Sequence, residues 1–131
     1  MVEIPASHAD LLSDDVKSFA FLATIMRSGK PQVTPVWFNY RDGYIYINTA
    51  EGRAKERNMQ QRPQVAIVIP DPENMYRYIE FRGHVVDGTI EGADEHIHFL
   101  SLKYRGTRYT IPAGQVRVMY RIEPDSVTVK D

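Results

Sequence analysis

The sequence predicts a mainly β fold, in which at least six antiparallel strands form a meander and two or three short helices lie at the connections. Tyr76–Asp87 alternates between apolar and polar residues over much of its length, which is the period of a strand. Asp42-Gly43 separates two β-rich runs and is a strong signal for a two-residue hairpin turn. Other short apolar runs are separated by Gly, Pro and polar residues. Such a meander usually closes into a small barrel, because closure removes exposed strand edges.

The first half of the chain is expected to hold one short helix and three strands. Pro5–Asp15 mixes apolar anchors with polar residues, and Ser7 suits a helix cap. The predicted strands are Phe19–Met26, Gln32–Tyr40 and Tyr44–Asn48, joined by a turn at Arg27–Lys30 and a hairpin at Arg41–Gly43. Pro35 cannot donate to a β ladder, so the second strand has an interruption or a free edge there.

The second half is expected to alternate helices and strands. A helix over Arg53–Gln61 ends before Pro63, and a second over Gly92–Tyr104 has one apolar face. The predicted strands are Gln64–Ile69, Tyr76–Asp87, and a last strand, Val116–Ile122 and Ser126–Val129, interrupted at Pro124. Pro70–Asn74 and Arg105–Gln115 are expected to be loops. Gly83 inside its strand indicates a bulge or a close approach of another backbone.

Composition bounds the class of protein. The 131 residues suit a single domain, residues 1–131, large enough for its own core. The net charge of −1 and a pI near 6.4 give no global field for nucleic acid, so any anion binding has to be local. There is no cysteine, which excludes disulfides and thiol chemistry. No signal peptide or membrane-length apolar run is apparent, so we expect a cytoplasmic protein that does not bind membranes.

Asn48–Met59 is the segment that most suggests a binding site. A β-rich run leads into a short helix that carries Arg53, Lys55 and Arg57. Long cations beside the positive end of a helix can hold an anion, most simply a phosphate. Arg53 and Lys55 can both reach such an anion, whereas Arg57, one turn further on, is expected over the helix flank. The alternative is a solvated helix face with Glu51 and Glu56 as partners, and the spacing alone favours this alternative.

Two aromatic segments are candidates for contact with a planar ring. In the first, Pro35 frees a backbone carbonyl, Thr34 offers a hydroxyl and Trp37 a stacking surface, although an edge strand of the core explains the same residues. The second segment, Tyr76–Phe81, surrounds Arg77 with aromatic rings. It suits a pocket wall, a dimer surface or ordinary cross-strand packing equally well.

Other chemistry is not indicated. The histidines do not have the i, i+4 spacing of a helical metal pair, and we expect all four on the surface or on polar faces: His8, His84, His96 and His98. We therefore predict no metal site. No Ser/His/Asp set, paired-carboxylate motif or glycine-rich phosphate loop is present, and the catalytic residues stay unassigned.

Taken in order along the chain, these segments resemble a known family. The similarity runs through Ala23–Ile25, Gly29–Phe38, Asn48–Asn58, Tyr76–Gly83, Ala93–Ile97, Lys103–Gly106 and Val116–Val118. It identifies the chain as similar to the split β-barrel flavin/deazaflavin oxidoreductases, the relatives of pyridoxamine 5′-phosphate oxidase. The subgroup that uses the deazaflavin coenzyme F420 is the most similar. Thr34–Phe38 and Asn48–Asn58 are the most specific parts.

The resemblance implies a split barrel of six to seven strands that forms a homodimer, with two cofactor sites at the subunit interface. It implies that Arg53 and Lys55, with Asn58, hold the cofactor phosphate. It places the tricyclic ring of the cofactor, and the ribityl chain attached to it, near residues of the second and third strands. It also places three residues of the partner subunit nearby. The residues concerned are Thr34, Pro35, Val36, Trp37, Asn48 and Thr49 in one subunit, and Tyr76, Arg77 and Tyr78 from the partner.

The implied function is an F420-dependent reductase, with hydride transfer between the cofactor and a small electron-poor organic substrate. An FMN-binding flavoprotein of the same fold is the alternative, since both cofactors share the phosphate and the tricyclic ring. A non-catalytic cofactor carrier or tetrapyrrole-binding protein is the alternative from another class. Pyridoxamine 5′-phosphate oxidase activity itself is not expected, because the residues that bind its substrate phosphate have no counterpart here.

Overall fold

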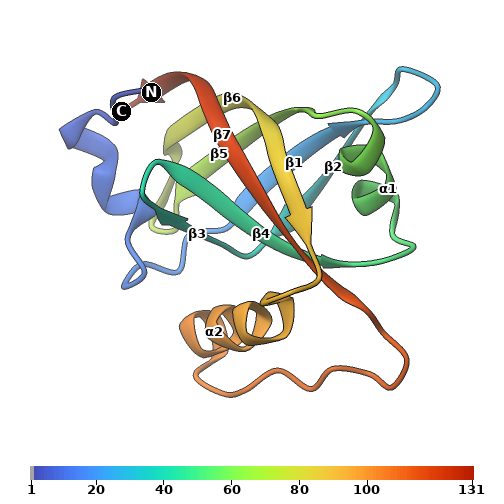
Figure 1. Cartoon of the computed structure of the whole chain (residues 1–131). Coiled ribbons are helices and arrows are strands. Elements are labelled where there is room, and N and C mark those ends of the chain that lie inside the picture. The colour runs from blue at the N-terminus through green and yellow to red at the C-terminus, as the bar shows by residue number, and fades with distance from the viewer. Residues whose placement is uncertain (1) are drawn as a thin grey trace.

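A computed structural model describes residues 2–131 as one curled antiparallel sheet with helices at its connections (Figure 1). The strands are β1 (Ala20–Ile25), β2 (Pro31–Val36), β3 (Phe38–Arg41), β4 (Tyr44–Ala50), β5 (Gln64–Asp71), β6 (Asn74–Thr89) and β7 (Arg117–Lys130). The helices are a 3₁₀ helix, η1 (Ala6–Leu12), and two α-helices, α1 (Ala54–Gln61) and α2 (Ala93–Arg105). The predicted mainly β split barrel is confirmed, with seven strands.

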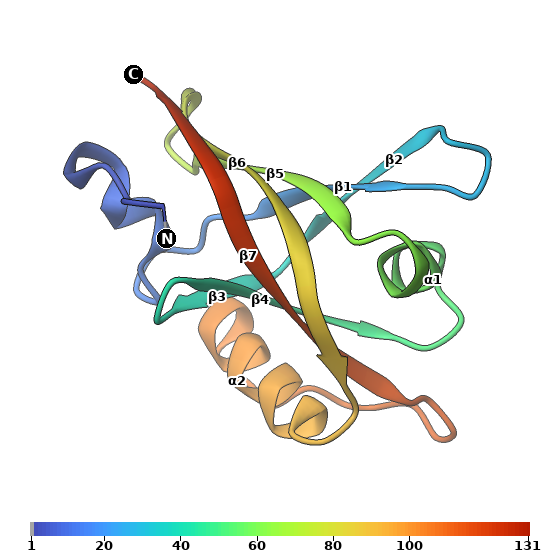
Figure 2. The ribbon, with the colours of Figure 1, turned by 45° about the horizontal axis from the view of Figure 1, so that its top comes forward.

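The order of strands in the sheet explains why it curls. It runs β2-β1-β5-β6-β7-β4-β3, so β2 and β3 lie at opposite edges. Only Trp37 separates β2 from β3 along the chain. The two edges are therefore held together at this residue, and the sheet bends into the open half-barrel seen in Figure 2.

The core fills the inside of this half-barrel. Alternate residues of the central strands point inward, as Ile67 and Ile69 do in β5 and Ile79 and Phe81 do in β6, and all four are almost completely buried. Leu11 and Leu12 of η1 close one end of the same cluster. Helix α2 lies outside it, over β4 and β7 (Figure 1).

Several local predictions are confirmed. Asp42 and Gly43 both have positive φ, 53° and 89°, as the predicted two-residue turn between β3 and β4 requires. Pro35 lies in an edge strand, and the predicted strand Gln32–Tyr40 is interrupted, two residues further on at Trp37. A Cβ on Gly83 would lie 2.4 Å from the carbonyl oxygen of Glu123, so the expected close backbone approach is real.

Two predicted irregularities are smaller than expected. Residues 70, 71 and 74 of the predicted loop belong to the β5–β6 hairpin, which leaves a turn of two residues. The last strand is continuous through Pro124, because the irregularity is absorbed as a bulge: Arg82 pairs with Ser126, whereas Gly83 pairs with Pro124. None of the helices within residues 2–131 has the length and apolar character that crossing a membrane requires.

Candidate functional site

A pocket of about 270 Å³ lies beside the point where the two sheet edges meet. We call it the basic pocket. Its lining comes from the residue before β1, from the end of β2 and the link to β3, and from β4. The start of α1, the start of β7, and α2 with the loop that follows it complete the lining. The lining residues are Phe19, Pro35, Val36, Trp37, Asn48, Arg53, Lys55, Ile97, Leu100, Arg105, Tyr109 and Arg117.

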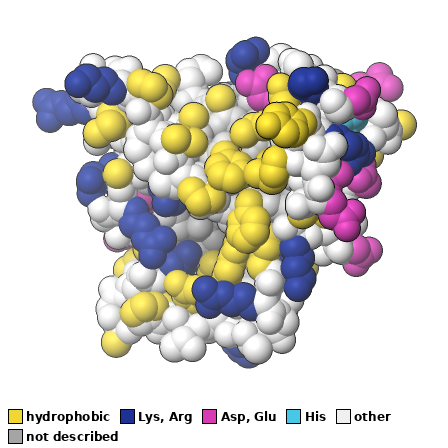
Figure 3. All heavy atoms as spheres, turned by 180° about the vertical axis from the view of Figure 1, so that it is seen from behind, with side chains coloured by type: hydrophobic (Ala, Val, Ile, Leu, Met, Phe, Trp, Pro, Cys, Tyr) yellow, Lys and Arg dark blue, Asp and Glu magenta, His cyan; other side chains and the backbone are white. Residues whose placement is uncertain are grey.

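The charge of this pocket is uniformly positive. Arg53, Lys55, Arg105 and Arg117 line it, and none of its lining residues is acidic. Burial lowers the pKa of the Lys55 ammonium, and the nearby charges of Arg53 and Arg117 lower it further. Cations this close repel one another unless an anion lies among them. Figure 3 shows Lys and Arg side chains around a hollow on this face of the molecule, bordered by hydrophobic side chains.

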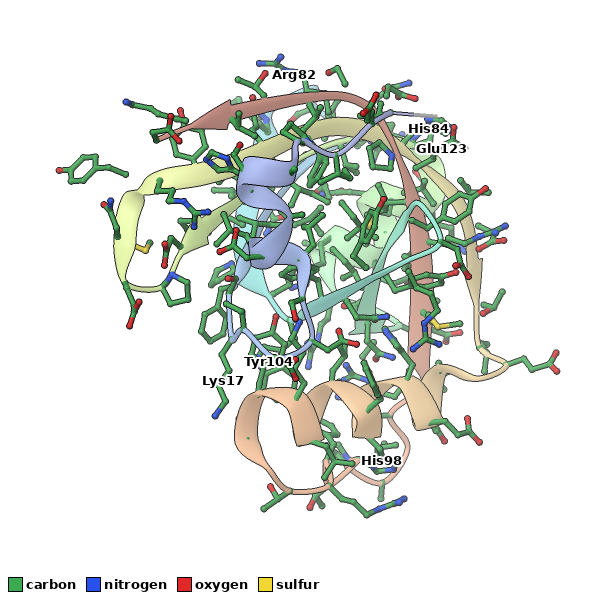
Figure 4. All side chains as sticks on the ribbon, turned by 90° about the vertical axis from the view of Figure 1, so that its left-hand side faces the viewer. Lys17, Arg82, His84, His98, Tyr104 and Glu123 are labelled. Atoms are coloured by element: carbon green, nitrogen blue, oxygen red, sulfur yellow. The ribbon has the colours of Figure 1, made fainter. Side chains whose placement is uncertain are left out.

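Aromatic rings form the opposite wall. Trp37 stacks on Tyr104 of α2, with ring centroids 5.3 Å apart and planes 6° from parallel. Arg105 lies over the indole at 5.0 Å, and Tyr109 meets its edge at 6.4 Å. Figure 4 shows Tyr104 between α2 and the sheet, where its hydroxyl donates to the Ser18 carbonyl over 2.5 Å. Trp37 is therefore held in place by its neighbours, and its ring lies beside the cationic side chains of the pocket.

Buried polar side chains fix the floor of the pocket. The Arg117 guanidinium donates to Asn48 Oδ1 over 2.9 Å, and Asn48 Nδ2 donates to the Ala93 carbonyl and lies 3.1 Å from His96 Nδ1. His96 Nε2 lies 2.7 Å from Asn39 Oδ1. Burial lowers the pKa of His96 to about 4, and the charges of Arg41 and Arg117 act in the same direction. Neutral His96, with its proton on Nε2, satisfies every partner in this row and so holds Asn48 and Arg117 in place.

The structure brings half of the sequence-predicted site residues together. Those that line the basic pocket are Pro35, Val36, Trp37, Asn48, Arg53 and Lys55. Thr34 and Thr49 lie next to lining residues in β2 and β4, each with a buried hydroxyl that has no hydrogen-bond partner within residues 2–131. Asn58 does not line the pocket. It is buried under α1, where its amide donates to the Thr24 hydroxyl over 3.0 Å.

The three residues expected from a partner subunit lie far from their own chain's pocket. Tyr78 pairs with Lys130 at one end of β7, whereas Arg117 of the pocket begins the other end of that strand. Arg77 is held by ion pairs to Asp10 at 2.7 Å and Asp71 at 2.9 Å. Tyr76 is 80% exposed. Within one chain these residues cannot reach the basic pocket.

Comparison with known proteins fits this arrangement. Residues 8–130 match the family described as pyridoxamine 5′-phosphate oxidase. The chain belongs to this family. The match spans nearly all of the sequence and confirms the resemblance on which the expectations above depend.

Solved structures carry the likeness further. An F420 reductase is 29% identical, with a TM-score of 0.84 over 95% of this chain and 98% of that one. A conserved hypothetical protein from Mycobacterium tuberculosis is 24% identical, with a TM-score of 0.73 over 100% of this chain and 86% of that one. HutZ, a haem storage protein from Vibrio cholerae, shares the fold at 15% identity, with a TM-score of 0.67 over 93% and 91%. The family fold thus occurs in proteins with different recorded roles.

Sequence reasoning missed half of the pocket lining in this family member. Phe19, Ile97, Leu100, Arg105, Tyr109 and Arg117 were not assigned to the site. Arg117 stands between two valines at the start of a strand, and nothing local marks it as buried. It reaches the pocket because β7 pairs with β4 in a register that sets Arg117 opposite Ala50, near Asn48. Arg105 and Tyr109 arrive through α2 and its following loop, which only the tertiary fold places here.

The histidine prediction was wrong for two of the four. His8 is 1% exposed, and its Nε2 lies 2.8 Å from the Lys130 carbonyl, so it ties η1 to the end of β7. His96 is the buried member of the pocket floor described above. His84 pairs with Asp125 at the surface, and Figure 4 shows His98 on the side of α2 away from the sheet. Within residues 2–131 no three His, Asp or Glu side chains gather as metal ligands would.

The charges of α1 divide between two faces. Arg57, which sequence reasoning placed over the helix flank, donates to the Gly52 carbonyl and does not line the basic pocket. Glu56, considered as a solvated partner for the cations, is 5% exposed and accepts a hydrogen bond from Tyr120 over 2.5 Å. The solvated-face explanation of this helix therefore fails for Glu56.

Proposed function

We propose that the protein is an F420-dependent oxidoreductase that acts on a small electron-poor organic substrate. The basic pocket carries the proposal: four cationic side chains without an acidic partner adjoin a rigid indole surface. Likeness to an F420 reductase at 29% identity, over nearly the whole of both chains, supports the choice of cofactor.

The residues present fit a phosphate-bearing tricyclic cofactor. Arg53 and Lys55 would hold the phosphate, and an anion there would offset the burial and the repulsion that together lower the pKa of Lys55. Pro35 and Trp37 would offer their strand and ring surface to the tricyclic ring, with Asn48 beside it. Bound F420 would supply the hydride, and the protein's part is to orient the cofactor and exclude water.

The proposal includes a homodimer with its sites at the interface. Pockets that enclose drug-sized ligands measure roughly 300–1,000 Å³. The basic pocket, at about 270 Å³, is too small to enclose a ring, a side chain and a phosphate together. Exposed Tyr76 and its neighbours suit the missing wall, supplied from the second subunit.

FMN is the competing cofactor, because the same cations and ring surface would serve it. Tetrapyrrole binding, which the fold shared with the haem storage protein HutZ suggests, has less support. The lining of the basic pocket contains no His, Cys or Met, and Tyr109 is its one side chain of a type that ligates haem iron.

Titration of the purified protein with F420 and, separately, with FMN tests the proposal. F420 binding is expected to change the cofactor fluorescence with saturation at one site per chain. Clear FMN binding with no response to F420 would overturn the assignment in favour of a flavoprotein. Tight binding of F420 without turnover of any electron acceptor would indicate a carrier instead.

Sedimentation at micromolar concentration tests the interface separately. A dimer is expected with and without cofactor, since the outer face of β1 and β2 carries exposed Val33 near half-exposed Ala23 and Ile25. A monomer that still binds F420 would contradict the interface-built site while leaving the cofactor assignment in place.

A further inference from the structure

A second and larger pocket, of about 680 Å³, lies on the other side of α1. We call it the α1–β6 pocket. It is lined by Glu51, Gly52, Glu56, Arg57, Met59, Gln60, Pro63, Val85, Val86, Asp87, Gly88, Ile90, Val118 and Tyr120, and it shares no lining residue with the basic pocket. The family function proposed above makes no use of it.

One of the lining residues of this pocket is a buried carboxylate. Glu56 is 5% exposed, and its Oε2 accepts the Tyr120 hydroxyl over 2.5 Å. Within residues 2–131, Oε1 of Glu56 accepts no hydrogen bond and no cationic side chain forms an ion pair with Glu56. Oε1 of Glu56 is therefore available to a cation that enters the pocket. A cation there would be favoured, because a buried charge without a counter-charge is costly.

The geometry around Glu56 is built by the strand register. Gly88 pairs with Tyr120, and a Cβ on Gly88 would lie 2.6 Å from the Tyr120 ring. The missing side chain thus lets the ring lie across β6 and aim its hydroxyl at Glu56. Burial and the Glu56 carboxylate raise the pKa of Tyr120, which keeps the phenol a neutral donor.

The other charges of the pocket do not neutralise Glu56. Asp87 is paired with Arg121 at 2.8 Å, and exposed Glu51 adds further negative charge at the rim. Arg57 is the one cationic lining residue, and its guanidinium is directed to the Gly52 carbonyl. The apolar part of the rim stands open to solvent: Ile90 is 58% exposed and Val86 39%.

We infer that the α1–β6 pocket binds a small organic cation, an amine or amidine with an apolar body, whose charge pairs with the free oxygen of Glu56. The apolar body would cover Val86 and Ile90, and the cation would lie next to the carboxylate. A site of this kind is independent of the cofactor, because α1 separates the two pockets.

Benzamidinium and neutral benzamide form a matched pair of probes that differ in charge. In ¹⁵N-correlated NMR spectra of the full chain, benzamidinium at millimolar concentration is expected to shift the amides of α1 and of residues 85–90. Benzamide is expected to shift them far less. Equal shifts from both probes, or none from benzamidinium, would overturn the inference.

Two pairs of variants locate the charge. Glu56→Gln is expected to weaken benzamidinium binding roughly tenfold or more, the scale of a lost charged hydrogen bond, whereas Glu95→Gln on exposed α2 surface leaves it unchanged. If Glu56→Gln does not fold, exposed Ile90 offers a second test. Ile90→Lys sets a competing cation at the rim and should abolish binding, whereas Ile90→Gln loses only the apolar contact and should weaken binding far less. Retained affinity in Glu56→Gln or in Ile90→Lys would refute the assignment.

Discussion

Lys55 and Glu56 are neighbours in α1, yet they line different pockets. Successive helix residues point about 100° apart, so a single helix can present opposite charges to two cavities. On the Lys55 side, several cations lie close together and none of the lining residues is acidic. On the Glu56 side, one carboxylate is buried with a single neutral donor.

The two pockets therefore leave charge unbalanced in different ways. The basic pocket gathers buried Arg117 with three cations that water can still reach, and it suits a multiply charged phosphate. The α1–β6 pocket holds a carboxylate shielded from water, and it suits one cationic group with an apolar body. In this protein, an unpaired charge in the folded structure indicates a ligand site more clearly than a pattern of residues in the sequence does.

The largest expected effect comes from removing Tyr104, the ring on which Trp37 of the basic pocket stacks. Tyr104→Ala is expected to lower the free energy of unfolding by roughly 3–5 kcal/mol, the range for truncating a large buried aromatic residue. Urea denaturation measures this loss. Tyr104→Phe keeps the stack on Trp37 and should lose only about 1–3 kcal/mol, for the Ser18 carbonyl and Phe38 amide left without the hydroxyl.

The Tyr104 pair of variants also separates the pockets. At temperatures where Tyr104→Ala is still folded, this variant should lose cofactor binding. It should keep the benzamidinium-induced NMR shifts around Glu56. Loss of both responses in a folded variant would show that the two pockets depend on one another.

The buried histidine of the basic pocket gives the next largest effect. Because the pKa of His96 is about 4 in the folded protein and near 6.5 in the unfolded chain, the unfolded state binds the proton more tightly between these values. Stability is therefore lost as the pH falls from 6.5 to 4, by up to about 3 kcal/mol at about 1.4 kcal/mol per pH unit.

Denaturant unfolding at pH 7 and at pH 4.5 measures this slope. His96→Gln is expected to flatten it, whereas His98→Gln, on the outer side of α2, should retain it. An unchanged slope in His96→Gln would mean that the row from Arg117 to Asn39 does not hold His96 neutral.

Lys55→Ala is expected to have the smallest effect on stability and a clear effect on binding. Loss of a charged hydrogen bond should weaken F420 by roughly 1–3 kcal/mol. Because the pKa of Lys55 is lowered in the folded state, its charge costs stability at neutral pH, and its removal should leave the unfolding midpoint unchanged or slightly raised. Fluorescence titration and thermal melting provide the two readouts, with exposed Lys17→Ala as the matched control. Unchanged affinity would remove Lys55 from the phosphate site.

Local signals in the sequence were sufficient for much of the fold. The Asp42-Gly43 turn, the close approach at Gly83 and the apolar face of α2 each depend on a few neighbouring residues. Pro124 misled, because a bulge opposite Gly83 let the strand continue where the residue type alone predicted a break.

The candidate site was predictable only where one segment supplies it. Pro35–Trp37 and Arg53 with Lys55 come from two short stretches with recognisable composition. Arg117 was missed because strand pairing, not sequence distance, brings it to Asn48. For Glu56 the local sequence was misleading, because the nearby cations suggested ion pairs at the surface. Only the fold shows that the Glu56 side chain turns inward to Tyr120.

The single-residue link at Trp37 also bears on how the chain folds. The β1–β2 and β3–β4 hairpins can each form locally, and once both exist the edges of the future sheet are already tethered. Bringing the β2 and β3 edges together then costs little loop entropy, because one residue joins them. β4 and β7 must still pair across a long stretch of chain. Opening the backbone at Trp37, as in a circular permutant, would free both edges at once. Cutting the β3–β4 turn or the β5–β6 turn would leave them joined.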